Sequence, residues 1–88
     1  MRHYLKTWTQ YFDRVLLRDK NFEVRRNNRD YQRGDVIVLQ DFDPESQQYS
    51  GREIVAEVSY VLLGGQFGIE KGFVVMGLKN IEGCDNDK

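Results

Sequence analysis

The stretch TWTQYFDRVLLRDKNFEVR, residues 7–25, contains the change of hydrophobic period that decides the fold. In its first half, apolar side chains follow the i, i+3, i+4, i+7, i+8 spacing of one helical stripe: Trp8, Tyr11, Phe12, Val15 and Leu16. This spacing predicts a helix over residues 8–17, with Trp8 in the core. Thr7 and Gln10 have the spacing of a capping box, in which each side chain satisfies a backbone N–H at the helix start.

The second half of the stretch has the two-residue period of a strand. Phe22 and Val24 alternate there with Glu23 and Arg25, so the apolar pair is expected to face the core and the charged pair the opposite side. Lys20 stands at the entry to this strand, close in sequence to both charged residues. The predicted order is therefore a helix followed at once by a half-buried strand.

Further strands are predicted on both sides of this stretch. Apolar or alternating runs that favour strands occupy residues 3–6, 36–39, 50–63 and 73–79. In the longest run, one face is expected to be buried against the core, the dry face of this strand. It carries Ile54, Ala56, Val58, Tyr60 and Leu62. Residues 43–46 form a turn around Pro44, and the glycine-rich loop after residue 63 is expected to be pinned to the core by Phe67 and Ile69.

One amphipathic helix beside about five strands predicts an α+β fold, a small open β-barrel with the main N-terminal helix packed beside it. Residues 1–80 are expected to form a single domain, and residues 81–88 an acidic, disordered tail that contains an inert Cys84. A parallel nucleotide-binding fold is not expected, because the crossover helices and a phosphate-binding glycine motif are both missing.

The composition excludes several classes of protein. Of the 88 residues, 40% are hydrophobic and 31% charged, as in an ordinary globular domain. A single Cys and a single His allow no internal disulfide and make a zinc site improbable, so no metal and no cofactor are expected. The start of the chain has no apolar run typical of a signal peptide or membrane span, which predicts a cytoplasmic protein with no membrane partner.

The net charge of -1 conceals an uneven distribution. Residues 14–33 hold seven Lys and Arg against three acids, whereas residues 34–88 hold four against ten. A local excess of positive charge attracts anionic partners even when the whole chain is near neutral. The plain alternative is a solvated surface on which the arginines pair with neighbouring acids.

Candidate ligand-binding residues follow the predicted helix. Lys20, Glu23 and Arg25 bring an ammonium, a carboxylate and a guanidinium together, which can bind a phosphate and the polar edge of a base. The following segment adds Asn27, Arg29 and Tyr31, whose ring is expected to stack on a base. The alternative is that Lys20, Glu23 and Arg25 form only an exposed ion network.

The spacing Lys20-x-x-Glu23-x-Arg25 resembles the G-x-K-x-x-E-x-R signature of the ASCH domain, in the PUA-like superfamily, with Arg18 at the position of the motif's Gly. Nearly the whole chain resembles a compact bacterial and phage subfamily of unknown function. The resemblance implies a small β-barrel with a helix beside it, a cleft whose floor carries these three side chains, and Lys6 near that cleft.

Three functions remain open at this stage. The first is a module that binds RNA or a nucleotide-like small molecule, favoured by the basic segment and by the link of ASCH relatives with RNA. The second is an amidohydrolase for an acylated nucleoside, with Lys20 as base and Glu23 as acid or orienting group; a related enzyme has Thr where this chain has Glu23. The third is an adaptor that binds a protein partner.

Overall fold

The computed structural model of the chain describes residues 1–84 and consists of one short helix and five strands. The elements in chain order are β1 (Arg2–Trp8), α1 (Thr9–Leu16), β2 (Phe22–Arg26), β3 (Val36–Asp43), β4 (Gln48–Leu63) and β5 (Phe73–Cys84). The predicted helix and strands are therefore present, although the strands at both ends of the chain are longer than their apolar runs suggest.

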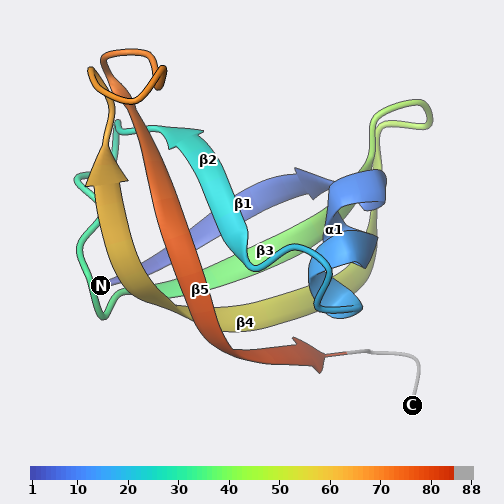
Figure 1. Ribbon diagram of the computed structural model, residues 1–88. Helices are drawn as coiled ribbons and strands as arrows, with labels where there is room; N and C mark the ends of the chain where they lie inside the picture. Colours follow the sequence, from blue (N-terminus) through green and yellow to red (C-terminus); the bar gives the residue numbers. More distant parts are fainter. Residues whose placement is uncertain (85–88) are drawn as a thin grey trace.

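All five strands belong to one sheet in the order β1-β3-β4-β5-β2. β1 is parallel to β3, and the other neighbours are antiparallel. The sheet curls into a half-barrel in which the edge strands β1 and β2 approach each other, and α1 lies at one end (Figure 1). The fold is thus a mostly β, barrel-like α+β architecture.

The core fills the concave side of the curled sheet. Its side chains alternate along the strands, as the two-residue period requires: Leu5, Ile37, Leu39, Ile54, Ala56, Val58, Val74 and Met76. Helix α1 contributes Phe12 and Val15, both almost completely buried. Only these two members of the five-residue helical stripe are fully buried, because α1 covers one end of the half-barrel and not its whole face.

Strand β4 changes its buried face part of the way along. Ile54, Ala56 and Val58 lie on the predicted dry face, but Tyr60, expected on the same face, is exposed. The pairing of β4 with β5 shifts register between Val58 and Tyr60, and Val61 then packs against the core instead. A β-bulge of this kind inserts one residue and moves all later side chains to the other face.

The start of α1 differs from the predicted capping box. Trp8 is the N-cap residue and no side chain caps the helix, while the Thr7 hydroxyl donates to the carbonyl of Leu5 within β1. Strand β1 continues through Trp8, so Thr7 belongs to the strand and cannot cap the helix. The helix itself is confirmed over Thr9–Leu16.

Helix α1 ends in a left-handed turn at Arg18. The backbone N–H groups of Arg18 and Asp19 donate to the carbonyls of Val15 and Arg14, the two hydrogen bonds of a Schellman motif. Arg18 has φ 70, in the left-handed region that favours glycine. Its guanidinium donates to the carbonyls of Leu16 and Ile81, which ties the helix end to β5.

Two expectations for the C-terminal half were wrong. Phe67 does not pin the loop between β4 and β5: its side chain is 83% exposed, and only Ile69 is half-buried. Residues 81–84, expected in a disordered tail, continue β5, where Glu82 and Gly83 pair with β4. Residues 85–88 and the side chain of Cys84 lie outside the described part of the structure.

Candidate functional site

Strand β2 turns its charged face inward. Glu23 is 3% exposed, whereas Phe22 and Val24, expected in the core, are largely exposed. The alternation was predicted correctly, but the side that faces the interior was wrong. Glu23 can be buried there because both of its carboxylate oxygens accept hydrogen bonds from cations.

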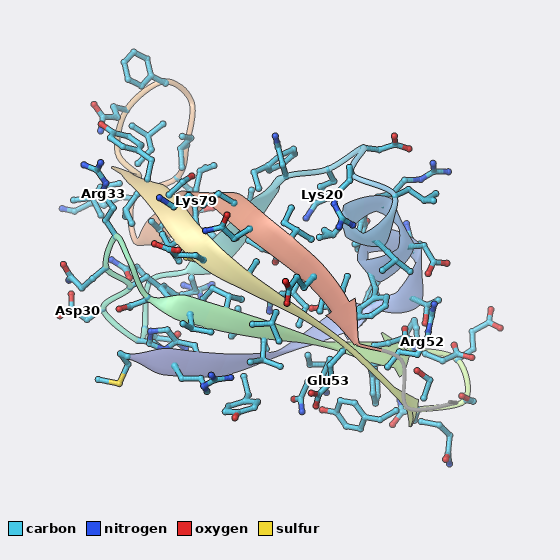
Figure 2. The ribbon with its side chains drawn as sticks, turned by 90° about the horizontal axis from the view of Figure 1, so that it is seen from below. Lys20, Asp30, Arg33, Arg52, Glu53 and Lys79 are labelled. Carbon is cyan, nitrogen blue, oxygen red and sulfur yellow. The ribbon has the colours of Figure 1, made fainter. Side chains whose placement is uncertain are left out.

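The three residues of the Lys-x-x-Glu-x-Arg pattern form one hydrogen-bonded group. Lys20 lies in the connection between α1 and β2 (Figure 2), and its Nζ donates to Glu23 Oε2 at 2.9 Å. Arg25 Nε donates to Glu23 Oε1, also at 2.9 Å. Glu23 therefore fixes the positions of both cations, and each cation occupies a different carboxylate oxygen.

Two arginines connect the facing edges of the half-barrel. Arg25 Nη2 donates to the carbonyl of Lys6 at 3.0 Å and to Thr7 Oγ1 at 3.2 Å. Arg29 Nη1 donates to the carbonyl of Tyr4 at 3.0 Å. Side chains from β2 and from the segment after it thus satisfy carbonyls on the free edge of β1, where no strand is paired.

A hollow of about 370 Å³ opens beside this connection. Its lining combines residues of β1, α1 and β2 with Lys20: Lys6, Thr7, Trp8, Tyr11, Glu23, Val24 and Arg25. It brings together Lys6, Lys20, Glu23 and Arg25, four of the residues singled out from the sequence. It contains three cationic side chains against one carboxylate, an excess of two positive charges.

Each cation of the hollow keeps donor capacity within the described part of the chain. Lys20 uses two of its three N–H donors, on Glu23 and on the carbonyl of Phe22. Arg25 uses Nε and Nη2, which leaves Nη1 without a protein acceptor among residues 1–84. Lys6 Nζ lies 4.4 Å from the centre of the Phe42 ring and donates to no acceptor in that range. The hollow can therefore donate several further hydrogen bonds to an anion.

Trp8 and Tyr11 line the same hollow and were not recognised as site residues. Trp8 was expected in the core, but its side chain is 48% exposed. His3, Leu5 and Thr7 occupy the inward positions of β1, so alternation sends Trp8 outward. Extending the predicted first strand by two residues would have given this orientation.

Asn27, Arg29 and Tyr31 do not line this hollow. Tyr31 is 3% exposed and packs edge-on against His3, with 4.7 Å between ring centres, so the structure does not place it where it could stack on a base. Burial raises the pKa of its hydroxyl, although the nearby Arg29 and Arg25 act in the opposite direction. Asn27 Oδ1 accepts from the backbone N–H of Tyr31 and helps to hold this segment in place.

A second buried carboxylate, Asp41, anchors α1 to the sheet near the hollow. Thr9 and Ser50 donate to it at 2.6 Å each, and Arg52 donates from Nε at 3.2 Å and from Nη2 at 3.0 Å. Figure 2 shows Arg52 at the end of the sheet near α1, where it also donates to Asp13 of that helix at 3.0 Å. Burial alone would raise the pKa of Asp41, but the hydrogen bonds from Ser50, Thr9 and Arg52 lower it below the usual value.

Residues 1–84 lack two features that would suggest other kinds of site. This part of the chain contains no helix with the length and apolar character needed to span a membrane. Nor do these residues bring three or more His, Cys, Asp or Glu side chains together in a way that could hold a metal ion.

The half-barrel sheet, the short helix and the charged hollow define a small, mostly β domain with a candidate anion site at its open edge. A family model described as Domain of unknown function (DUF3850) matches residues 2–78, and the chain belongs to this family. The chain is also similar to a protein of Escherichia phage P2 described as "Uncharacterized 12.9 kDa protein in GpA 3'region", with 34% identity over 59 residues. That match covers 67% of this chain and 52% of the phage protein, so the chain spans about half the length of the curated relative it matches.

Proposed function

We propose that this protein is a binding module for RNA or a nucleotide-like molecule, with the ligand's phosphate held in the hollow by Lys6, Lys20 and Arg25. The observation that carries the proposal is the excess of two positive charges in a hollow of about 370 Å³, with unused donors on all three cations. Charge-assisted hydrogen bonds to phosphate are about twice as strong as neutral ones. Glu23 acts as a positioning residue, since both of its oxygens are already occupied by Lys20 and Arg25.

The resemblance to the ASCH domain of the PUA-like superfamily is part of the proposal. It rests on Lys20, Glu23 and Arg25 lining one hollow and on the left-handed backbone at Arg18, where the ASCH signature has Gly. A longer RNA could extend along Arg26 at the end of β2 and the basic segment that follows, which carries Arg29 and Arg33. Arg29 is the least available of these, because its Nη1 is engaged by the carbonyl of Tyr4.

Removal of one hollow cation is expected to weaken phosphate binding about tenfold or more, because a hydrogen bond to a charged group contributes about 1.5–3 kcal/mol. Lys6→Ala is the cleanest variant, since the Lys6 ammonium has no acceptor among residues 1–84 and its loss leaves the Glu23 group intact. The measurement is the dissociation constant for short single-stranded RNAs and for nucleoside 5′-monophosphates, by calorimetry. Lys79→Ala is the matched control, because Lys79 lies on β5 outside the hollow and its ammonium pairs, among residues 1–84, with Glu57 alone, at 3.7 Å.

The salt dependence of RNA affinity is a second test of phosphate binding in the hollow. For single-stranded RNA, the logarithm of the association constant should fall with the logarithm of salt concentration, with a slope of about 0.7 per phosphate contact. Lys6→Ala should reduce this slope by about that amount, whereas Lys79→Ala should not change it. The absence of association with any of these ligands at low salt would refute the proposed function.

Binding is favoured over hydrolysis of an acylated nucleoside because Thr7, which carries the one aliphatic hydroxyl among the lining residues of the hollow, is not set up as a nucleophile. Thr7 Oγ1 donates its proton to the carbonyl of Leu5 and accepts from Arg25, so no base is placed to activate it. Lys20 Nζ is engaged by Glu23 and by the carbonyl of Phe22. Turnover of an acylated cytidine by the wild type, abolished in Lys20→Ala, would instead support the hydrolase.

A further inference from the structure

Trp8 and Tyr11 form a partly exposed aromatic wall on the hollow. Their ring centres are 6.4 Å apart and the ring planes differ by 20°, a stacked arrangement. Trp8 is 48% exposed and Tyr11 45% exposed, although large aromatic side chains gain most from being buried. Two nearly parallel, half-exposed rings at the edge of a charged hollow offer a flat apolar surface on which a planar group can stack.

The aromatic wall adjoins the cations directly. The Tyr11 ring lies 5.9 Å from Lys20 Nζ, and Trp8 follows Lys6 by two residues along β1. Lys6, Lys20, Trp8 and Tyr11 all line the same hollow. One ligand can therefore contact the wall with a planar group and the ammonium groups with an anionic group.

The charge and the size of the hollow narrow the class of ligand. A phosphate monoester carries about −1.5 to −2 at pH 7, which matches the excess of two positive charges better than the single charge of a phosphodiester does. The volume of 370 Å³ lies near the lower end of the range for small-molecule sites, about 300–1,000 Å³. The hollow thus fits one nucleotide unit and not several consecutive ones.

We propose that the hollow takes a single nucleoside monophosphate, free or at the end of an RNA chain, with its base stacked on the Trp8–Tyr11 wall and its phosphate monoester on Lys6, Lys20 and Arg25. This inference rests on the proposed function and deepens it. Phosphate contacts alone would accept any organic phosphate, whereas the aromatic wall selects for a base.

The first experiment uses the fluorescence of Trp8, the only tryptophan of the chain. The full chain is titrated with each of the four ribonucleoside 5′-monophosphates, with ribose 5-phosphate, and with the corresponding 3′,5′-cyclic monophosphates. A stacked base should change the Trp8 emission, and ribose 5-phosphate should bind about tenfold more weakly than the nucleotides. The cyclic phosphodiesters should also bind more weakly, because they carry only one negative charge.

The second experiment separates the base from the phosphate by mutation. Trp8→Leu is expected to lower nucleotide affinity about tenfold, measured by calorimetry, and to leave ribose 5-phosphate affinity unchanged. Phe67→Leu is the matched control, since Phe67 is an exposed aromatic residue outside the hollow. Short RNAs with and without a terminal phosphate distinguish a free nucleotide from a chain end, because only the phosphorylated end supplies a monoester.

The outcomes separate this inference from the proposed function. Equal affinity for ribose 5-phosphate and nucleotides, or unchanged nucleotide affinity in Trp8→Leu, would overturn base stacking while the phosphate site stands. Binding of RNA regardless of a terminal phosphate, with no binding of mononucleotides, would overturn the single-nucleotide site but keep RNA binding. No binding of any phosphate compound would overturn both.

Discussion

Replacing Asp41 with alanine is expected to lower the free energy of unfolding by about 3 kcal/mol, a large share of the roughly 5–10 kcal/mol expected for a domain of this size. The substitution removes the acceptor of the Ser50 hydroxyl and the nearer acceptor of the Thr9 hydroxyl, which keeps only the carbonyl of Phe42 at 3.4 Å. It also removes one of the two carboxylates that hold Arg52. Removing one partner of a buried charged group costs more than the pair itself contributes, because the remaining charge stays desolvated. Urea unfolding followed by circular dichroism measures the change.

The control for this variant is Asp19→Asn. Asp19 also pairs with an arginine, Arg14 at 2.9 Å, but both side chains are exposed. An exposed ion pair contributes little, so the control should stay within about 0.5 kcal/mol of the wild type. Equal stability of Asp41→Ala and the control would show that the Asp41 hydrogen bonds do not hold the helix to the sheet.

The Asp41 carboxylate also makes the stability of the fold depend on pH in the acidic range. The pKa of Asp41 is lowered in the folded state, so its stabilisation is complete above its unfolded pKa of about 3.9 and is lost as the pH falls through the folded value. Asp35 has a lowered pKa as well: its burial acts to raise the pKa, but hydrogen bonds with His3 and Gln32 lower it. Asp41→Asn should therefore lose less stability below about pH 4 than the wild type, but not become independent of pH.

Replacing Glu23 with alanine is expected to destabilise the fold by about 3 kcal/mol. Glu23 is almost fully buried and is the shared acceptor of Lys20 and Arg25, whose side chains are themselves largely shielded from water. Without it, the Lys20 ammonium and the Arg25 guanidinium both lose the carboxylate to which they donate. Unfolding in urea measures the loss. Glu53→Ala is a control on β4, because within the described residues the Glu53 carboxylate accepts a single long hydrogen bond, from Gln40 at 3.4 Å.

Glu23→Gln separates the structural and binding effects of the carboxylate. The amide keeps the shape and one acceptor oxygen, so the loss of stability should be smaller than in Glu23→Ala. The uncompensated positive charge of the hollow rises from two to three, so nucleoside monophosphates should bind more tightly. A weaker affinity in a variant that remains folded would show that the second carboxylate oxygen of Glu23, which holds one of the two cations in place, matters more for binding than the added positive charge.

The fold could be predicted where one hydrophobic period was strong. The helix over Thr9–Leu16 and the buried face of Ile54, Ala56 and Val58 follow from local spacing, which the chain carries in its own sequence. The exposure of Tyr60 could not be predicted, because the bulge depends on how β4 pairs with β5. A Cβ atom added at Gly77 of β5 would lie 2.6 Å from Ser59 Oγ of β4, so the packing at this bulge depends on residues of both strands.

The charged residues of the candidate site could be predicted, but its aromatic residues and its orientation could not. Alternation divides β2 into two faces without showing which one is buried, and hydrophobicity favoured Phe22 and Val24. The burial of Glu23 depends on Lys20 and Arg25 satisfying both of its oxygens, which only the curled sheet brings about. Tyr31 was predicted to belong to the site from its residue type alone. Its burial against His3, a residue distant in sequence, could not be seen from local spacing.

The guanidinium groups of Arg25 and Arg29 also affect how copies of this chain can meet. An unpaired strand edge is a template for intermolecular β-sheet growth, the first step toward fibrils. Here, the carbonyls of Tyr4 and Lys6 on β1 are already occupied by side chains of the same molecule. A second copy could pair with β1 only by breaking these two hydrogen bonds from arginine side chains. The two arginines therefore disfavour self-aggregation at that edge.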